Sequence, residues 1–366
     1  MKAPRSPRID TDIHPSVAGD RIEAFLDEPW KRRWKTGNRG PGHLGYWNPH
    51  GVNRSDTTLP DGRRIETSAV TLEEHFMDPY GIDYGILNPG GALHFGNHPE
   101  VDYASVYCRA CNHVVAEDWL DGHPRLRASI CVSPGDPLRA AEEIHFWGKH
   151  PGFVQVLMCS GQRFGYGQRC FDPIYEAAVA HDLPVAIHPG SEGVGISGAP
   201  TAAGYPSNYF EWHTGLVGSY IAHLVSLVCE GTFVKFPTLR FVLVEGGVAW
   251  IPPLLWRLDK NWKSLRQTTP WLERPPSEYV FEHIFLTTQP LEEPDRKEHL
   301  GQILAMFPAD KMLMFSSDYP HWDGDTPDFV LRFLSPELRD PVFHQTAARL
   351  YKLPVTTESS KPQQPA

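Results

Sequence analysis

The chain has 366 residues, of which 41% are hydrophobic and 21% are charged, a balance typical of folded globular proteins and not of disordered ones. Its formal net charge is -10, and its only Lys/Arg run is "KRR" at residues 31–33, which argues against nucleic acid as a partner. The first residues lack the apolar core of a signal peptide, and no stretch of about 18 apolar residues occurs, so we expect a cytoplasmic protein with no membrane partner.

Apolar runs typical of buried strands alternate with helical patterns along the chain. We expect strands over residues 8–14, 84–90, 126–134, 152–160, 183–190, 239–247, 283–290 and 311–320. Helical spacing marks residues 171–182, 215–231 and 250–266, the last broken near its start by Pro252 and Pro253. Strands that alternate with helices pair in parallel, and eight such units favour an α/β fold of the (β/α)8 TIM barrel type over an open sheet.

We expect this barrel to be a single domain over residues 8–354, between a flexible N-terminal tail (1–7) and a disordered C-terminal tail (355–366). Two long aperiodic segments, 30–68 and 190–213, would lie above the carboxyl ends of the strands, where long loops usually carry function. We therefore interpret both as loops that cover an active site.

The two long segments are rich in aromatic side chains, which favours an aromatic or polycyclic small molecule as the substrate. The aromatic residues are Trp30, Trp34, Tyr46, Trp47, Tyr205, Tyr209 and Trp212. Arginines in the first segment are candidates to meet a carboxylate of that substrate, although a solvated surface position is the commoner role for each. These arginines are Arg32, Arg33, Arg39 and Arg54.

Polar residues stand at the carboxyl ends of four of the expected strands. They are Asp12, His14, His188, Glu245 and Asp318. Any one of them alone is more often a cap or a hydrogen-bonded core residue, but a barrel brings all of these strand ends to one mouth. Carboxylate and imidazole donors that converge there predict a divalent metal site suited to Zn, Mn or Fe. Asp10 lies deeper on the same strand face, and we expect it to be a buried hydrogen-bonding partner.

These residue types, their order and their barrel positions resemble the amidohydrolase superfamily, in particular its branch of aminocarboxymuconate semialdehyde and aromatic-acid decarboxylases. The matching motifs are Asp12 and His14 in "DIH", His188 in "HPG" and Asp318 in "SSDYPH", and the similarity runs from about residue 8 to residue 352. The resemblance implies a (β/α)8 fold with one metal ion held by these four side chains.

One position departs from the pattern of the family. The strand over 239–247 ends in Glu245, where the decarboxylases carry a histidine that positions water or substrate beside the metal. A carboxylate there can act as a general base or bind a second cation. His223, on the expected helix over 215–231, is the nearest candidate to assist it, although a lone helix histidine is more often part of the core.

Three functional hypotheses follow. The main one is a metal-dependent lyase or hydrolase that decarboxylates or hydrolyses a carboxylated small molecule, with one divalent ion per chain and with Asp318 or Glu245 moving the proton. The alternative is a non-heme dinuclear-iron monooxygenase on the same barrel, with Glu245 and His223 completing a second metal site. A non-catalytic barrel is the least favoured, because every position of the metal site is filled. The sequence leaves open the metal, the substrate and whether the chain forms a homo-oligomer.

Overall fold

The computed structural model describes residues 5–37 and 54–354. The strands are β1 Ile9–Ile13, β2 Tyr84–Leu87, β3 Leu126–Cys131, β4 Phe153–Cys159, β5 Val185–His188, β6 Phe241–Leu243, β7 Ile284–Thr287 and β8 Leu313–Met314. The α-helices are α1 Gly19–Ala24, α2 Trp30–Lys35, α3 Ala69–Leu72, α4 Asp78–Tyr80, α5 Gly90–Gly96, α6 Val101–Val115, α7 Pro137–Trp147, α8 Asp172–Ala180, α9 Tyr209–Gly215, α10 Val217–Cys229, α11 Thr232–Lys235, α12 Ile251–Leu265, α13 Pro276–His283, α14 Lys297–Leu304, α15 Ala309–Met312, α16 Pro327–Leu331, α17 Pro336–Asp340 and α18 Thr346–Tyr351.

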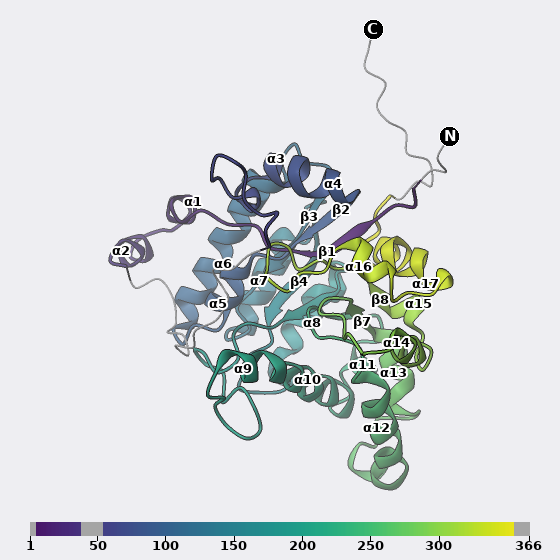
Figure 1. Ribbon diagram of the computed structural model, residues 1–366. Helices are drawn as coiled ribbons and strands as arrows, with labels where there is room; N and C mark the ends of the chain where they lie inside the picture. The colour runs from purple at the N-terminus through teal and green to yellow at the C-terminus, as the bar shows by residue number, and fades with distance from the viewer. Residues whose placement is uncertain (1–4, 38–53, 355–366) are drawn as a thin grey trace.

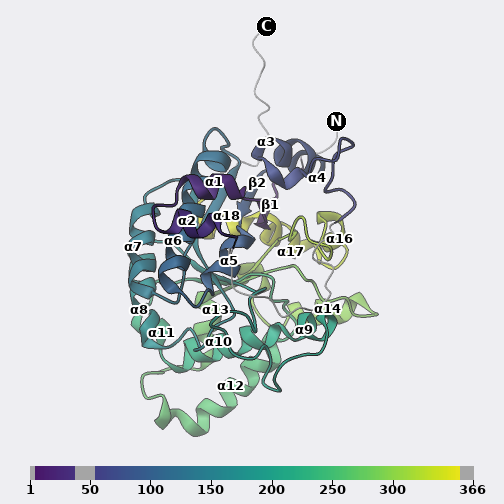
Figure 2. The ribbon, with the colours of Figure 1, turned by 90° about the vertical axis from the view of Figure 1, so that its left-hand side faces the viewer.

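All eight strands form one sheet in chain order, and every neighbouring pair is parallel. Backbone hydrogen bonds also join the first and last strand regions: Thr11 N donates to Phe315 O at 3.0 Å, and His14 N donates to Tyr319 O at 2.8 Å. Helices surround the strands in two perpendicular views (Figures 1 and 2). The predicted (β/α)8 barrel is therefore confirmed.

Each strand lies inside its predicted range but is shorter than predicted. The largest difference is at β6 and β8, which cover three and two residues of the ranges 239–247 and 311–320. Within the remainder of these two predicted ranges, Glu245 and Asp318 have left-handed backbones, with φ of 58° and 55°, which a regular strand does not contain. The strands themselves are almost entirely buried, as expected for a parallel sheet covered by helices.

The expected break near the start of the helix over 250–266 is wrong. Helix α12 begins at Ile251 and carries Pro252 and Pro253 in its first turn. The N–H groups of a first turn have no partner inside the helix, so proline loses no hydrogen bond there. Helix α12 extends away from the barrel at the bottom of Figure 1. No helix in the described part of the chain is long and apolar enough to cross a membrane.

The first long segment is only partly a loop in the part that the structure describes. It contains α2, whose Trp30 ring stacks on Tyr103 of α6 at 5.6 Å and whose buried Trp34 lies 6.0 Å from the ring of Phe95 in α5. These two indoles pack against helices instead of standing free as a mouth lining. The expected tail over 355–366, part of the tail over 1–7, and Arg39, Tyr46 and Trp47 lie outside the described residues.

Candidate metal centre

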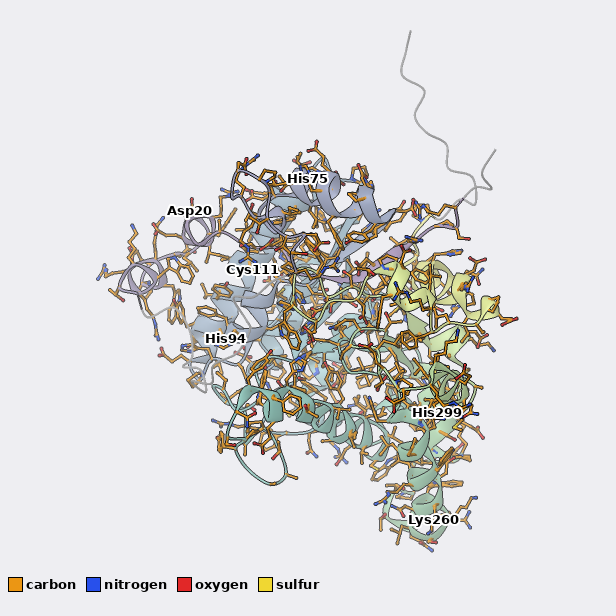
Figure 3. All side chains as sticks on the ribbon, in the orientation of Figure 1. Asp20, His75, His94, Cys111, Lys260 and His299 are labelled. Atoms are coloured by element: carbon orange, nitrogen blue, oxygen red, sulfur yellow. The ribbon has the colours of Figure 1, made fainter. Side chains whose placement is uncertain are left out.

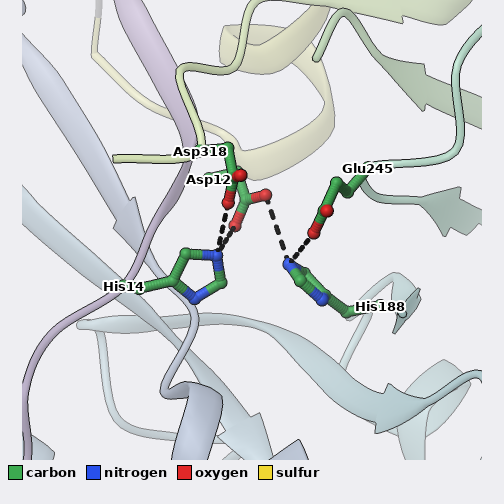
Figure 4. A group of neighbouring side chains, drawn as sticks. All are labelled: Asp12, His14, His188, Glu245 and Asp318. Carbon is green, nitrogen blue, oxygen red and sulfur yellow. Dashed lines mark hydrogen bonds and ion pairs between the residues drawn. The ribbon is translucent and has the colours of Figure 1, made fainter. Parts of the chain in front are cut away.

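The structure brings together the five polar residues that the sequence places at strand ends. One ligand atom from each of Asp12, His14, His188, Glu245 and Asp318 lies within 4.8 Å of all the others (Figure 4). We call these five residues the strand-end group. They come from the carboxyl ends of β1, β5, β6 and β8, which parallel pairing and barrel closure bring to one mouth.

Both imidazoles point the same ring nitrogen at the carboxylates. His14 Nε2 lies 2.9 Å from Asp318 Oδ1 and 3.4 Å from Asp12 Oδ1. His188 Nε2 lies 3.3 Å from Asp12 Oδ2 and 3.2 Å from Glu245 Oε2. The two rings are perpendicular, with centroids 4.9 Å apart. The two Nε2 atoms and the carboxylate oxygens therefore face a common centre.

The other ring nitrogen of each histidine is tied to the backbone. His14 Nδ1 lies 2.7 Å from Asn88 O, and His188 Nδ1 lies 3.0 Å from Pro189 O. A carbonyl oxygen can only accept, so each Nδ1 carries a proton and donates it. In a neutral imidazole this leaves a lone pair on Nε2, directed at the centre, which is how metal-binding histidines are usually held.

Three polar atoms of the strand-end group are buried without a hydrogen-bond partner. They are Asp12 Oδ2, His188 Nε2 and Asp318 Oδ2. Leaving a polar atom buried and unsatisfied costs roughly 1–3 kcal/mol, so three at one point call for a ligand. A divalent cation fits, because it accepts lone pairs from oxygen and nitrogen alike, and this mixed N/O set suits Mn, Zn or Fe.

The acid–base properties of the group also indicate a need for positive charge. Burial lowers the pKa of His14, but the charges of Asp12 and Asp318 outweigh this effect and raise it to about 9. Burial, followed by the charges of Asp318 and Asp323, raises the pKa of Glu245 well above its ordinary value. Several buried carboxylates thus compete for little positive charge, and a divalent ion would supply it.

A buried network of side-chain hydrogen bonds fixes the position of Asp12. The Asn88 amide donates to Asp12 Oδ1 at 2.8 Å, and Ser129 Oγ donates to Asn88 Oδ1 at 2.5 Å. Gln155 Nε2 donates to Ser129 Oγ, and Tyr351 OH donates to Gln155 Oε1, both at 2.8 Å. The network occupies one oxygen of Asp12 and leaves the other for the centre. Sequence reasoning missed Asn88, although it directly follows the apolar strand β2.

Asp10 lies deeper than the strand-end group, as expected. It is fully buried, and its Oδ1 accepts hydrogen bonds from Ser317 N at 2.9 Å and Asp12 N at 3.2 Å. The bond from Ser317 N joins β1 to the segment after β8, and the bond from Asp12 N lies within β1, so Asp10 helps to close the barrel and to align Asp12.

A histidine that sequence reasoning missed lies beside Asp318. His321 Nδ1 is 2.7 Å from Asp318 Oδ1, and its ring centroid is 4.5 Å from that of His14. Its side chain is 34% exposed, so it connects a fully buried carboxylate with solvent. The available signal was its position three residues after Asp318, in the motif "SSDYPH".

His223 is not part of this site, contrary to the expectation that it assists Glu245. Its Nε2 lies 2.6 Å from Ser160 O, and its Nδ1 accepts from Tyr166 N at 3.2 Å. Both ring nitrogens are therefore committed to backbone groups, and burial lowers the pKa of His223 to about 4. Besides His188, the histidine close to Glu245 is His213 in α9, which forms a second group with Glu245 and Asp323.

Comparison with known proteins identifies a family model that matches this chain and relatives with similar sequences. The family model described as "Amidohydrolase" matches residues 9–353. A gamma-resorcylate decarboxylase of Rhodococcus jostii is 26% identical over 283 residues, which cover 70% of this chain and 78% of that protein. A 2-keto-4-carboxy-3-hexenedioate hydratase of a Sphingobium species is 24% identical over 307 residues, which cover 74% of this chain and 79% of that protein.

Solved structures share the fold at low sequence identity. One is 5-carboxyvanillate decarboxylase from Novosphingobium aromaticivorans, solved with manganese and 4-hydroxy-3-methoxy-5-nitrobenzoic acid. It is 19% identical, with a TM-score of 0.68, over 95% of this chain and 96% of that one. The barrel is therefore shared along nearly the whole of both chains.

Proposed function

This chain belongs to the amidohydrolase family, and from that membership we propose that it is a metal-dependent decarboxylase of a small carboxylated acid. In this proposal Asp12, His14, His188 and Asp318 hold one divalent ion. The observation that carries it is the set of buried, unpartnered atoms at the carboxyl end of the barrel: Asp12 Oδ2, His188 Nε2 and Asp318 Oδ2. Active sites of this fold lie at that end.

A bound divalent ion would act as a Lewis acid for an oxygen of the substrate. The protein must then deliver a proton, because the bond to the carboxyl group breaks, its electron pair stays on the substrate carbon, and CO2 leaves. The Asp318–His321 pair is suited to deliver it, because the two side chains lie 2.7 Å apart. Burial alone would raise the pKa of Asp318, but the charge of His321 opposes this effect and helps to lower the pKa below its ordinary value, so the proton rests on the imidazole and passes through the carboxylate. The partly exposed His321 can return a proton from solvent to Asp318 after each turnover.

The substrate class rests on the relatives and on the aromatic rings near the centre. One relative acts on gamma-resorcylate and another on a carboxyvanillate, both aromatic acids. In this chain the ring of Trp322 lies 5.6 Å from that of His213, which in turn stacks on Tyr209 at 5.5 Å. Trp322 is 43% exposed, so it offers a flat apolar surface at the edge of the site. An aromatic carboxylic acid is therefore our preferred substrate.

Hydration of an unsaturated acid is a second candidate, favoured by the hydratase relative. A carboxylate such as Glu245, 3.2 Å from His188 Nε2, is placed to activate water beside the same ion. Neither of the two relatives named above is an oxygenase, and both ring nitrogens of His223 are bound to backbone groups, so the monooxygenase alternative built on Glu245 and His223 is not favoured.

The test begins with elemental analysis of protein purified without added metal, followed by assays of the metal-loaded enzyme. The substrate panel contains dihydroxybenzoic acids, carboxylated hydroxymethoxybenzoic acids and unsaturated keto acids. We expect release of CO2 from an aromatic acid, and its loss when the metal is removed by a chelator. Water addition to an unsaturated acid without CO2 release would favour the hydratase. Metal-independent turnover would refute both.

A further inference from the structure

A second group of metal-binding side chains adjoins the strand-end group and shares one residue with it. His213 of α9, Glu245 after β6 and Asp323 in the segment after β8 each place one ligand atom within 4.8 Å of the others. We call these three residues the loop group. Glu245 belongs to both groups, so its carboxylate lies between two sets of donors.

The side chains of the loop group face one another without sharing a proton. His213 Nε2 lies 3.4 Å from Asp323 Oδ2, yet Asp323 Oδ2 is buried and has no hydrogen-bond partner. The two side chains therefore do not form a hydrogen-bonded His–Asp pair. Glu245, whose side chain is only 10% exposed, adds a further acceptor. An imidazole nitrogen and carboxylate oxygens that face one another without a hydrogen bond are the arrangement expected around a cation.

The balance of charges in the two groups also indicates a bound cation. The two groups together contain four carboxylates, and among the salt bridges of residues 5–37 and 54–354 these pair with histidines and with no lysine or arginine. With all four carboxylates ionised, one divalent ion in the strand-end group would balance two of their negative charges. Buried charges that remain unpaired are costly, and a second divalent ion would balance them.

Local packing fixes the direction of His213. Asn208 Oδ1 caps α9 by accepting from Glu211 N at 3.0 Å, and Trp212 Nε1 donates to Glu192 O at 3.1 Å. The His213 ring contacts the rings of Tyr209 and Trp322, at 5.5 and 5.6 Å between centroids. The imidazole is thus held toward Asp323 by contacts that come from both α9 and the segment after β8.

We propose that His213, Glu245 and Asp323 bind a second divalent transition-metal ion, with the carboxylate of Glu245 bridging it to the ion of the strand-end group. One imidazole and two carboxylates suit Mn, Zn or Fe, and two such ions that share a carboxylate lie about 3.5–4 Å apart. The proposal goes beyond the decarboxylase function, which needs only the first ion. It also gives Glu245 a role that a histidine at the end of β6 could not fill, because a neutral imidazole offers one lone pair to one ion.

The experiment titrates the full-length, metal-free protein with Mn2+ alone. Bound metal is counted per chain, and electron paramagnetic resonance detects coupling between neighbouring Mn2+ ions. We expect two equivalents and a coupled spectrum for the wild type. His213→Gln and Asp323→Asn should each bind one equivalent and give the spectrum of isolated ions. Affinity for the second ion should fall by more than the roughly 10- to 100-fold that loss of an outer partner of a metal ligand costs.

The matched control is His299→Gln, an exposed histidine on α14 at the edge of the molecule in Figure 3, which should keep both equivalents. Circular dichroism and thermal melting establish that each variant is folded, and the two loop-group variants are independent of each other. A wild type that binds only one equivalent, a His213→Gln variant that keeps both, or a control that loses one would overturn the proposal. Metal counts do not depend on catalysis, so failure of the decarboxylase proposal would leave this result intact.

Discussion

The strand-end group and the loop group share Glu245 but are held in different ways. Asp12, His14, His188 and Asp318 stand at strand ends with side chains 0–6% exposed, whereas His213 and Asp323 stand on a short helix and a loop with side chains 21% and 14% exposed. Backbone bonds of the barrel fix the first group, such as the one from Asp318 N to Asp12 O at 3.1 Å. The position of His213 depends mainly on side-chain contacts of α9.

This difference has consequences for metal affinity. Ligands on rigid strand ends lose little freedom when an ion binds, while ligands on loops must also be ordered. We therefore expect a tight ion in the strand-end group and a weaker one in the loop group. Substitutions in the barrel should affect both metal and activity, and substitutions around α9 should affect only the second ion.

The largest effect is expected from His188→Ala. This change removes a nitrogen whose neighbours, Asp12 Oδ2 and Glu245 Oε2, lie 3.3 and 3.2 Å away, so the site loses a donor that nothing nearby replaces. We expect the tight ion and the activity to be lost together, by more than roughly 100-fold in affinity. Elemental analysis and turnover measurements check this, with His299→Ala as the surface control. A His188→Ala variant with full metal and full rate would remove His188 from the site.

Two carboxylates of the same strand should behave differently. Asp12→Ala and His14→Ala should lower metal occupancy, because both side chains face the centre. Asp10→Ala should keep the metal and instead lower the free energy of unfolding by roughly 1–3 kcal/mol, since it leaves the N–H groups of Ser317 and Asp12 without their acceptor. Denaturant unfolding and metal analysis separate the two outcomes. Loss of metal in Asp10→Ala but not in Asp12→Ala would show that the strand face is assigned wrongly.

Glu245→Gln examines the residue that the two groups share. The change keeps the shape of the side chain and removes its charge, so a bridging carboxylate would become a poor ligand for the second ion. We expect loss of about one equivalent of metal, matching His213→Gln, while the first ion is retained. An unchanged metal count with a rate lowered by about 10²–10⁴ would instead make Glu245 a group that only moves protons. That outcome would contradict the second site.

The sequence predicted the strand-end group because topology alone determines where those residues meet. Asp12, His14, His188 and Asp318 follow apolar runs, and parallel strands in a barrel send their carboxyl ends to one mouth whatever the loops do. Asn88 follows the same rule and was recognisable in principle, because it directly follows β2.

The loop group was not predictable by the same rule. His213 lies in a segment without hydrophobic period, and its direction depends on its contact with Trp322 and on the hydrogen bond from the neighbouring Trp212 to Glu192 O. His223 failed as a prediction for a related reason. A helix position near the site does not say which way the side chain points, and this ring turns to the backbone of Ser160 and Tyr166.

The smallest effect is expected from Trp212→Phe, a variant that tests whether the anchoring of α9 limits the affinity for the second ion. Trp212→Phe keeps an aromatic ring beside His213 but removes the hydrogen bond from Trp212 Nε1 to Glu192 O, which ties α9 to the loop after β5. A single hydrogen bond contributes about 0.5–1.5 kcal/mol, so the second ion should bind roughly two- to tenfold more weakly while the first is unchanged. The measurement is a Mn2+ titration that resolves both equivalents.

Trp34→Phe is the matched control. Trp34 Nε1 also donates to a backbone oxygen, that of Gly19, at 3.1 Å, but Trp34 belongs to the distant α2. If Trp34→Phe lowers the affinity for the second ion as much as Trp212→Phe does, the lower affinity reflects a general loss of protein stability. The distinction between ligands on rigid strands and ligands on loops would then fail.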